Sequence, residues 1–308
     1  MIVFEDVTVR YRGVPALEGV NLTIQEGALG VLVGPSGSGK STLIRLVNRL
    51  VEPDRGRVLV RGIDVMALDP PELRRSIGYV IQSVGLFPHR TVARNIATVP
   101  RLLGWPRARI DAQVDAMLEL VRLDGSFRHR YPDELSGGQA QRVGLARALA
   151  AEPDILLMDE PFGAVDPITR RELQGELTRI HRETGKTILL VTHDPREALD
   201  LATLIVVLRA GHIVAASRPE ILAHEPGAFA RDLFGADTLI LDRLRRRHVG
   251  AFVSGEAQDE DPSISAEAPL SEALLCMMET GRERLRVVDA EGRAMGSITF
   301  HAILETAP

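Results

Sequence analysis

The sequence predicts an α/β protein in which helices cover a largely parallel sheet, with a helical insertion and a small α+β unit after it. Apolar, strand-like runs alternate with helical patterns, which is typical of parallel sheets. Residues at about 83–151 show helical patterns without strands, and the pattern changes again after residue 235. We therefore expect a domain over 1–235 that contains this helical subdomain, and a second unit over 236–308. The strand-like runs are Leu29 to Val33, Val58 to Val60, Ile77 to Ile81, Ile155 to Met158, Thr187 to Val191 and Leu204 to Leu208.

The first of these runs, Leu29 to Val33, leads into a glycine-rich loop with the composition of a phosphate-binding site. Glycines allow successive backbone N–H groups to turn toward one point without steric cost. Lys40 reaches the outer phosphates, Ser41 offers a hydroxyl to Mg²⁺, and the helix opening at Ser41 directs its positive end at the same anion. The sequence therefore predicts a P-loop for a nucleoside triphosphate, made of Gly34, Pro35, Ser36, Gly37, Ser38, Gly39, Lys40, Ser41 and Thr42.

The segment that begins at Gln82 is expected to be a hinge between the sheet and the helical subdomain. After it, Val84, Leu86 and Phe87 lie in a loop, where apolar side chains are costly to expose unless something covers them. Two alternatives stay open: a helix of another subunit covers them, or they pack on their own subdomain. Helical spacing then predicts an amphipathic helix with an apolar face of Ile110, Val114, Met117, Leu118 and Val121.

The segment LSGGQ, Leu135 to Gln139, begins another helix. Ser136 is a good N-cap, and Gly137 and Gly138 leave backbone N–H groups uncovered. The segment therefore predicts a second anion-binding helix start, ahead of a helix from Gln139 to Ala150. One nucleotide does not need two such starts. The alternative is a capped helix with a flexible entry.

Two carboxylates follow the apolar run Ile155 to Met158, which has the pattern of a strand buried on both faces. Such a strand delivers Asp159 and Glu160 to the C-terminal edge of the sheet, where ligands bind in this fold class. Asp159 is placed to hold Mg²⁺, directly or through water, and Glu160 to orient and activate the attacking water. A surface turn is the alternative, but a turn does not require four preceding apolar residues.

These motifs, in this order, resemble the ATPase subunits of ABC transporters over roughly the first 235 residues. The resemblance implies a P-loop NTPase fold with ATP and Mg²⁺ as ligands. It also implies a homodimer in which two copies face head to tail, each ATP lying between the P-loop of one chain and the LSGGQ of the other. This arrangement would explain the second anion-binding helix start, and a single copy should hydrolyse ATP poorly.

The same resemblance adds residues to the expected site. Tyr11 resembles the aromatic residue that stacks on adenine, Gln82 the Q-loop glutamine, and His193 the switch histidine that contacts the γ-phosphate. Asp166, in GAVDP, resembles the D-loop aspartate. The expected catalytic residues are Glu160, His193, Gln82 and Lys40. The expected Mg²⁺ ligands are Ser41, Gln82 and Asp159. The expected ATP contacts outside the P-loop are Tyr11, Asp166, Ser136, Gly137, Gly138 and Gln139.

The amino-acid sequences of several segments resemble those of the osmoprotectant branch of ABC importers, which takes up glycine betaine, choline, carnitine or related quaternary amines. That branch implies integral membrane permease subunits, an extracytoplasmic substrate-binding protein and a place on the cytoplasmic face of the inner or plasma membrane. In ABC importers the region after Gln82 receives the coupling helices of the permease. The segments are NRLVEP, IGYVIQSVGLFPH, NIATVP, RYPDELSGGQ and EPFGAVDPITR.

The last seventy or so residues pose a separate question. A basic run, Arg243 to His248, precedes an acidic stretch, Glu256 to Pro262, and a helix-like segment, Leu270 to Thr280. Leu285 to Asp289, a turn, Met295 to Thr299 and a closing helix resemble one CBS motif, although such motifs usually come in pairs. Two alternatives remain: a small dimer-supporting unit, or a regulatory unit in which the basic run meets anionic lipid or the acidic stretch according to ionic strength.

Composition excludes other classes. Cys276 is the only cysteine, so an intramolecular disulfide framework is excluded. A start without basic residues and the lack of a long apolar run predict neither a signal peptide nor a membrane span. A net charge of -5 gives no general electrostatic reason to expect nucleic acid as a partner. The remaining rival is a soluble ABC ATPase acting on nucleic-acid or ribosomal complexes, but such relatives typically carry two cassettes or a long coiled-coil insertion.

Overall fold

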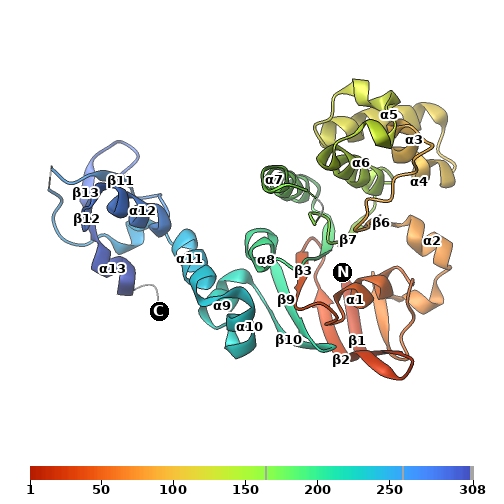
Figure 1. The fold of residues 1–308 in the computed structure, drawn as a ribbon, viewed down its shortest axis with the longest axis horizontal. Coiled ribbons are helices and arrows are strands. Elements are labelled where there is room, and N and C mark those ends of the chain that lie inside the picture. The colour runs from red at the N-terminus through yellow and green to blue at the C-terminus, as the bar shows by residue number, and fades with distance from the viewer. Residues whose placement is uncertain (164, 259, 306–308) are drawn as a thin grey trace. The chain divides into compact units, whose positions relative to one another are not determined.

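The computed structural model describes residues 1–163, 165–258 and 260–305 (Figure 1). The chain divides into two compact units between Arg218 and Pro219, earlier in the sequence than the expected boundary at 235/236. The reason is packing: helices α9 and α10 lie with α11 in the second unit. These helices span Pro219–His224, Gly227–Phe234 and Ala236–Arg246.

The main sheet of the first unit has the strand order β10-β9-β3-β8-β7-β6. All neighbours pair in parallel except β10, which pairs antiparallel with β9 at the edge. Strands β3, β7 and β8 are buried at every position, as expected of central parallel strands. The predicted largely parallel sheet is confirmed. Its strands are β3 (Leu29–Val33), β6 (Ile77–Val80), β7 (Ile155–Asp159), β8 (Thr187–Val191), β9 (Leu204–Arg209) and β10 (His212–Ser217).

A second sheet, with strand order β2-β1-β4-β5, is antiparallel throughout. It corrects one prediction, because the run Val58 to Val60 belongs to β4 of this sheet and not to the parallel one. Val58 pairs with Phe4 of β1, and only part of β4 is buried. A three-residue apolar run does not reveal which sheet it joins. The strands are β1 (Ile2–Tyr11), β2 (Val14–Ile24), β4 (Arg55–Val60) and β5 (Ile63–Asp64).

Helix α1, Lys40–Val47, lies between these layers and joins their cores. Its apolar side chains, Leu43, Ile44, Leu46 and Val47, are all fully buried, in one cluster with residues of β1, β2, β3 and β7. This packing fixes the start of the helix at the end of β3. The other helices of this part are α2 (Pro70–Arg75), α7 (Pro167–Thr184) and α8 (Pro195–Leu201), with the short 3₁₀ turn η1 (Val65–Ala67).

The helical subdomain follows β6, and Figure 1 shows helices α3 to α6 gathered together. The predicted apolar stripe is present on α5: Ile110, Val114 and Leu118 are buried, and Met117 is half-buried. The subdomain consists of α3 (Val92–Ile96), α4 (Thr98–Leu102), α5 (Arg107–Leu120) and α6 (Gly137–Leu149), with 3₁₀ turns η2 (Gly125–His129) and η3 (Pro132–Glu134).

The second unit carries a three-stranded sheet of order β11-β12-β13, parallel between the first pair and antiparallel between the second. The predicted helix, strand, turn, strand and closing helix are all present, while the CBS-like assignment stays a prediction. The elements after α11 are η4 (Val249–Phe252), β11 (Ser263–Ser265), α12 (Leu270–Thr280), β12 (Arg284–Val288), β13 (Ala294–Thr299) and α13 (Phe300–Glu305).

The charged runs of this unit are engaged inside it. Arg243 is buried and donates to the carbonyl of Ala223 at 2.6 Å. Asp261 is also buried and accepts a hydrogen bond from Arg284 at 2.6 Å. Asp261, which belongs to the acidic stretch of the salt-dependent hypothesis, is thus already paired with Arg284. Asp259 of the same stretch lies outside the described residues, and the salt-dependent contact of the basic run stays a prediction.

Candidate nucleotide-binding site

The P-loop connects β3 to α1, and its lysine is held in place by the loop itself. Lys40 Nζ donates to the carbonyls of Gly34 and Pro35 at 2.7 and 2.9 Å. Burial lowers the pKa of Lys40, while the nearby Glu160 and Asp159 carboxylates act in the opposite direction. The ammonium group is thus fixed by the carbonyls of the loop, and the adjoining helix directs the positive end of its dipole toward the same loop.

Gly39 shows why this loop requires glycine at that position. Its φ is +104°, and a Cβ there would lie 2.6 Å from both the carbonyl oxygen of Ala16 and Leu17 Cδ2. Strand β2 therefore passes so close to the loop that no side chain fits. At Gly37, by contrast, the space around a Cβ is open.

We expect Gly39→Ala to lower the free energy of unfolding by about 1–3 kcal/mol, because it adds both backbone strain and a clash with β2. Gly175→Ala in α7 is the matched control. A Cβ at Gly175 meets nothing within 4 Å, and the change should stabilise the chain by about 0.4–1 kcal/mol. Urea unfolding of both variants without nucleotide measures the difference. Equal stability of Gly39→Ala and the parent would contradict the clash.

Asp159, the last residue of β7, reaches the start of α1. Ser41 Oγ donates to Asp159 Oδ1 at 3.2 Å, and Arg45 lies 3.8 Å from Asp159 Oδ2. Burial raises the pKa of Asp159, which the Ser41 hydrogen bond and the Arg45 charge partly oppose. The two predicted Mg²⁺ ligands, Ser41 and Asp159, are therefore neighbours.

Glu160 stands at the centre of a second cluster. Gln82 Nε2 donates to Glu160 Oε2 at 2.9 Å, and His193 Nδ1 lies 3.5 Å from the same oxygen. The backbone of Glu160 has a φ of +48°, and its N–H donates to the carbonyl of Val191 in β8. A left-handed conformation at a non-glycine residue is costly and often marks a functional position. The structure thus brings three predicted catalytic residues together, because the side chains of Gln82 and His193 both approach the carboxylate of Glu160.

The LSGGQ segment forms the N-terminal end of α6. Ser136 is the N-cap, accepting from the N–H of Gln139 at 3.3 Å, and the Gln139 side chain accepts from the N–H of Ser136 at 3.0 Å. This capping box confirms the predicted helix start. Ser136 and Gly137 are exposed. A Cβ at Gly138 would lie 2.4 Å from Thr169 Cγ2, so LSGGQ packs closely on the first turn of α7.

Asp166 and Tyr11 complete the predicted set. Asp166 is the N-cap of α7 and accepts from the N–H groups of Ile168 and Thr169 at 3.0 and 3.1 Å. Hydrogen bonding from Thr169 lowers the pKa of Asp166. Tyr11 is 49% exposed at the end of β1, where it pairs with Val14 of β2, the strand that touches the P-loop.

Comparison with known proteins identifies the family. The family described as ABC transporter matches residues 17–163. Over 308 residues the chain is 47% identical to the glycine betaine uptake system ATP-binding protein YehX of Escherichia coli (strain K12), and 100% of each chain is covered. The chain is an ABC transporter ATP-binding protein.

Further comparisons agree with this. The ABC protein is 43% identical over 305 residues to the glycine betaine/carnitine/choline transport ATP-binding protein OpuCA of Bacillus subtilis (strain 168), covering 98% of this chain and 79% of the relative. A dimeric post-hydrolysis structure of the ATP-binding cassette MJ0796 bound to ADP and Pi matches at a TM-score of 0.64 and 34% identity, covering 71% of this chain and 99% of that one. The predicted ABC ATPase fold is confirmed.

The loop of this ABC protein fits the phosphates of ATP. Ser38 Oγ is buried and makes no hydrogen bond within the part of the chain that the structure describes. The adjoining Lys40 ammonium and the N-terminal end of α1 supply positive charge, and Gly37 leaves open space beside them. Ser41 and Asp159 offer hard oxygen ligands of the kind that Mg²⁺ prefers.

Some residues of this ABC protein escaped the sequence analysis. Arg45 faces Asp159 from one turn after Ser41, a spacing that helix geometry could have revealed. Glu197 in α8 is buried and accepts from Thr192 and, at 3.1 Å, from Gln174 of α7. These contacts hold the turn that carries His193. No local signal distinguishes Glu197 from other polar residues of a helix.

The sequence also predicted that the chain contains no membrane span. Within 1–163, 165–258 and 260–305, no helix combines the length and the apolar character that crossing a bilayer requires.

Proposed function

We propose that this chain is the ATP-hydrolysing subunit of an importer for quaternary-amine osmoprotectants such as glycine betaine, choline and carnitine. The observation that carries the proposal is similarity along the whole chain to YehX, whose name includes glycine betaine uptake. OpuCA, whose name includes glycine betaine, carnitine and choline transport, supports the same substrate class. The first unit alone would support only an ABC ATPase, because no residue described above contacts the transported molecule.

In the proposed reaction, water attacks the γ-phosphorus of ATP and the bond to the bridging oxygen of ADP breaks. Glu160 orients this water and accepts its proton, while Gln82 and His193 hold the carboxylate in place. Lys40 stabilises the charge that develops on the phosphate oxygens. Mg²⁺ supplies further charge neutralisation when it is bound by Ser41 and Asp159, with Gln82 as the third proposed ligand.

A homodimer supports this chemistry best. LSGGQ has the form of a second anion-binding helix start, in which Gly138 packs on Thr169 of α7 while Ser136 and Gly137 are exposed. A second copy would place Ser136 to Gln139 against the ATP of the first, with Asp166 close to the junction and Tyr11 against adenine. The relative MJ0796 has been solved as a dimer, which supports the dimeric part of this proposal.

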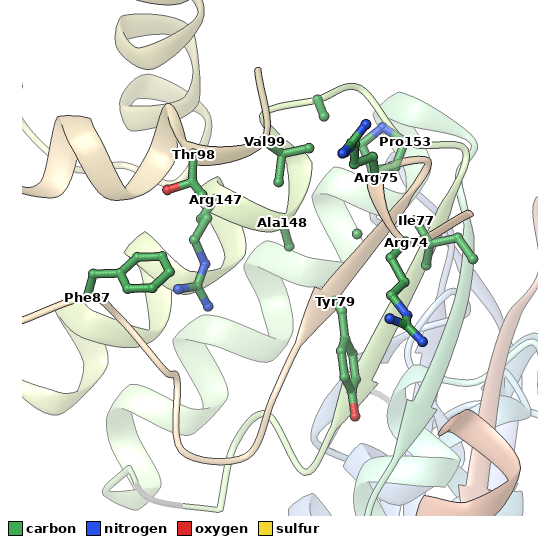
Figure 2. A pocket seen from close by; sticks show the side chains of 12 residues that line it. Arg74, Arg75, Ile77, Tyr79, Phe87, Thr98, Val99, Arg147, Ala148 and Pro153 are labelled. Carbon is green, nitrogen blue, oxygen red and sulfur yellow. The ribbon is translucent and has the colours of Figure 1, made fainter. Parts of the chain in front are cut away.

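The permease is proposed to dock at a cavity of about 230 Å³ between β6 and the helical subdomain (Figure 2). Its lining combines apolar and basic side chains from separate elements, as a docking site for a helix requires. Phe87, from the loop after Gln82, is 37% exposed beside it. Of the three apolar residues for which two alternatives were left open, Phe87 is exposed, whereas Val84 and Leu86 are half-buried. Other lining residues include Arg75, Tyr79, Thr98, Val99, Arg147 and Pro153.

The complete importer would add permease subunits and an extracytoplasmic substrate-binding protein, with this subunit on the cytoplasmic face of the membrane. The test is purification of the chain with its native partners, reconstitution, and ATPase measurement with glycine betaine, choline and carnitine in turn. We expect a membrane permease to co-purify and at least one amine to stimulate turnover. Co-purification with ribosomes or DNA instead, or no stimulation by any quaternary amine, would reject the proposal.

A further inference from the structure

The loop after Gln82 has an unusual backbone. Val84 and Gly85 both have a φ of +58°, the left-handed region that a β-branched residue such as valine strongly disfavours. The turn is tight, because the N–H of Val84 donates to the carbonyl of Ile81 and that of Gly85 to the carbonyl of Ser83. Something outside the loop must hold this conformation.

Arg147, on the last turn of α6, holds it. Its guanidinium donates to the carbonyl of Gly85 at 2.5 Å and to that of Val84 at 2.7 Å, so one side chain binds both left-handed residues. Figure 2 shows Arg147 extending from α6 toward the part of the loop that bears Phe87. Burial lowers the pKa of Arg147, and a guanidinium remains charged in any case. These are charged donors on two backbone acceptors, the stronger class of hydrogen bond.

Close packing supports the same junction. A Cβ at Gly144 of α6 would lie 2.8 Å from Val84 Cγ1, so the valine side chain rests directly on the backbone of the helix. Gly144 is itself buried in α6. Val84 is thus fixed to α6 twice, by its side chain and by its carbonyl oxygen.

The other end of the loop is tied to the same subdomain. Asn95 of α3 is fully buried, accepts from the N–H of Phe87 at 2.8 Å, and donates to the carbonyls of Phe87, Arg90 and Thr91. Phe87, which borders the cavity, therefore lies between two anchors, Arg147 and Asn95. Gln82, at the start of the loop, binds Glu160 at the edge of the sheet instead.

We propose that Arg147 is a positioning residue that joins the loop Val84–Arg90 rigidly to α6, so that a push on Phe87 moves the LSGGQ end of the same helix. Helix α6 runs without interruption from Gly137 to Leu149 and transmits displacement along its length. Ser136 sits at one end of this lever and Arg147 at the other. The inference rests on the proposed function, because it assumes that a permease displaces Phe87 and that the LSGGQ segment moves as a result.

The test compares Arg147→Ala, Arg147→Lys and the exposed control Arg107→Ala in the reconstituted transporter. The readout is the ratio of amine-stimulated to basal ATPase activity. Removal of two charge-assisted hydrogen bonds should reduce the stimulated increment about tenfold in Arg147→Ala. Arg147→Lys, which keeps the charge but reaches only one carbonyl, should retain an intermediate increment, and Arg107→Ala the parent increment, because the Arg107 side chain is 97% exposed.

A second set of measurements separates coupling from folding and from ATP binding. The ATP dissociation constant of the isolated full chain should be the same for Arg147→Lys and the parent, and thermal unfolding should show that the variant is folded at the assay temperature. Gly144→Ala, which displaces Val84 without touching Arg147, should also reduce the stimulated increment. Loss of stimulation in proportion to loss of ATP affinity would overturn the proposal.

The two hypotheses fail differently. A parent complex that shows no amine stimulation rejects the proposed function. A parent complex that is stimulated, together with a folded Arg147→Ala or Arg147→Lys complex that is stimulated equally, rejects the role of Arg147.

Discussion

Glu160→Gln should lower ATP turnover by about 10²–10⁴-fold, the range typical for loss of a general base. The substituted amide has nearly the same shape but cannot accept the proton of the attacking water. It can still occupy the place between Gln82 and His193 that the carboxylate fills. ATP binding should therefore persist, because Lys40 and the rest of the P-loop are untouched, and the dimer should accumulate with ATP trapped.

Initial rates at saturating Mg²⁺ and ATP, together with size-exclusion chromatography in ATP, check both parts of this expectation. Glu119→Gln is the matched control, because Glu119 is an exposed carboxylate on α5. It should leave rate and dimerisation unchanged. A Glu160→Gln protein that turns over ATP at the parent rate would remove Glu160 from the reaction.

The strands that carry the site were predictable because their physics is local. Ile155 to Met158 is a short run of apolar residues typical of a strand buried on both faces, and a strand that ends there brings Asp159 to the sheet edge. Ser136 and Gln139 have the spacing of a capping box, which sets a helix start from four residues alone.

Two features, the sheet that Val58 to Val60 joins and the division of the chain at Arg218, depend instead on contacts between distant parts of the sequence. Val58 to Val60 is strand-like by itself, but its sheet depends on pairing with Phe4, far away in sequence. The division at Arg218 depends on which core α9 and α10 bury their apolar residues against, such as Leu222 and Phe234. The sequence of an amphipathic helix shows that one face is buried, but it does not show which core that face packs against.

The contacts between the predicted site residues could not be predicted from the sequence either. Nothing in the spacing of Gln82, Glu160 and His193 indicates that one carboxylate oxygen would receive both other side chains. Arg147 is the clearer case, since its role appears only when its two acceptors, Val84 and Gly85, adopt left-handed conformations. A motif identifies which chemistry is present, while tertiary packing decides which groups share an atom.

The second large effect concerns whether the site is shared between two copies. Lys40→Ala removes the phosphate-binding ammonium, and Gly137→Asp places a negative charge at the exposed start of α6, where the γ-phosphate is proposed to bind. Each homodimeric variant should lose turnover by about 10²-fold or more, because both of its sites are damaged. Asp in the first turn of a helix is favourable, so Gly137→Asp should fold.

A heterodimer of one Lys40→Ala copy and one Gly137→Asp copy should recover activity. The intact P-loop of the Gly137→Asp copy would face the intact LSGGQ of the Lys40→Ala copy, which gives one complete site where the parent has two. Turnover of about half the parent value is expected if the sites act independently in a two-fold symmetric dimer. Co-expression with two affinity tags, purification on both in sequence, and an ATPase assay measure it.

The control carries the same two substitutions in one copy, paired with a parent copy. In a shared-site dimer each site of this control contains one damaged part, either the P-loop without Lys40 or the LSGGQ segment altered by Gly137→Asp, so it should be inactive. If each chain instead holds a whole site, the parent copy keeps its site and the control is active, while the first heterodimer is inactive. The two arrangements thus predict opposite orders of activity for proteins of identical composition, and the order observed decides whether Ser136 acts on its own chain's ATP or on its partner's.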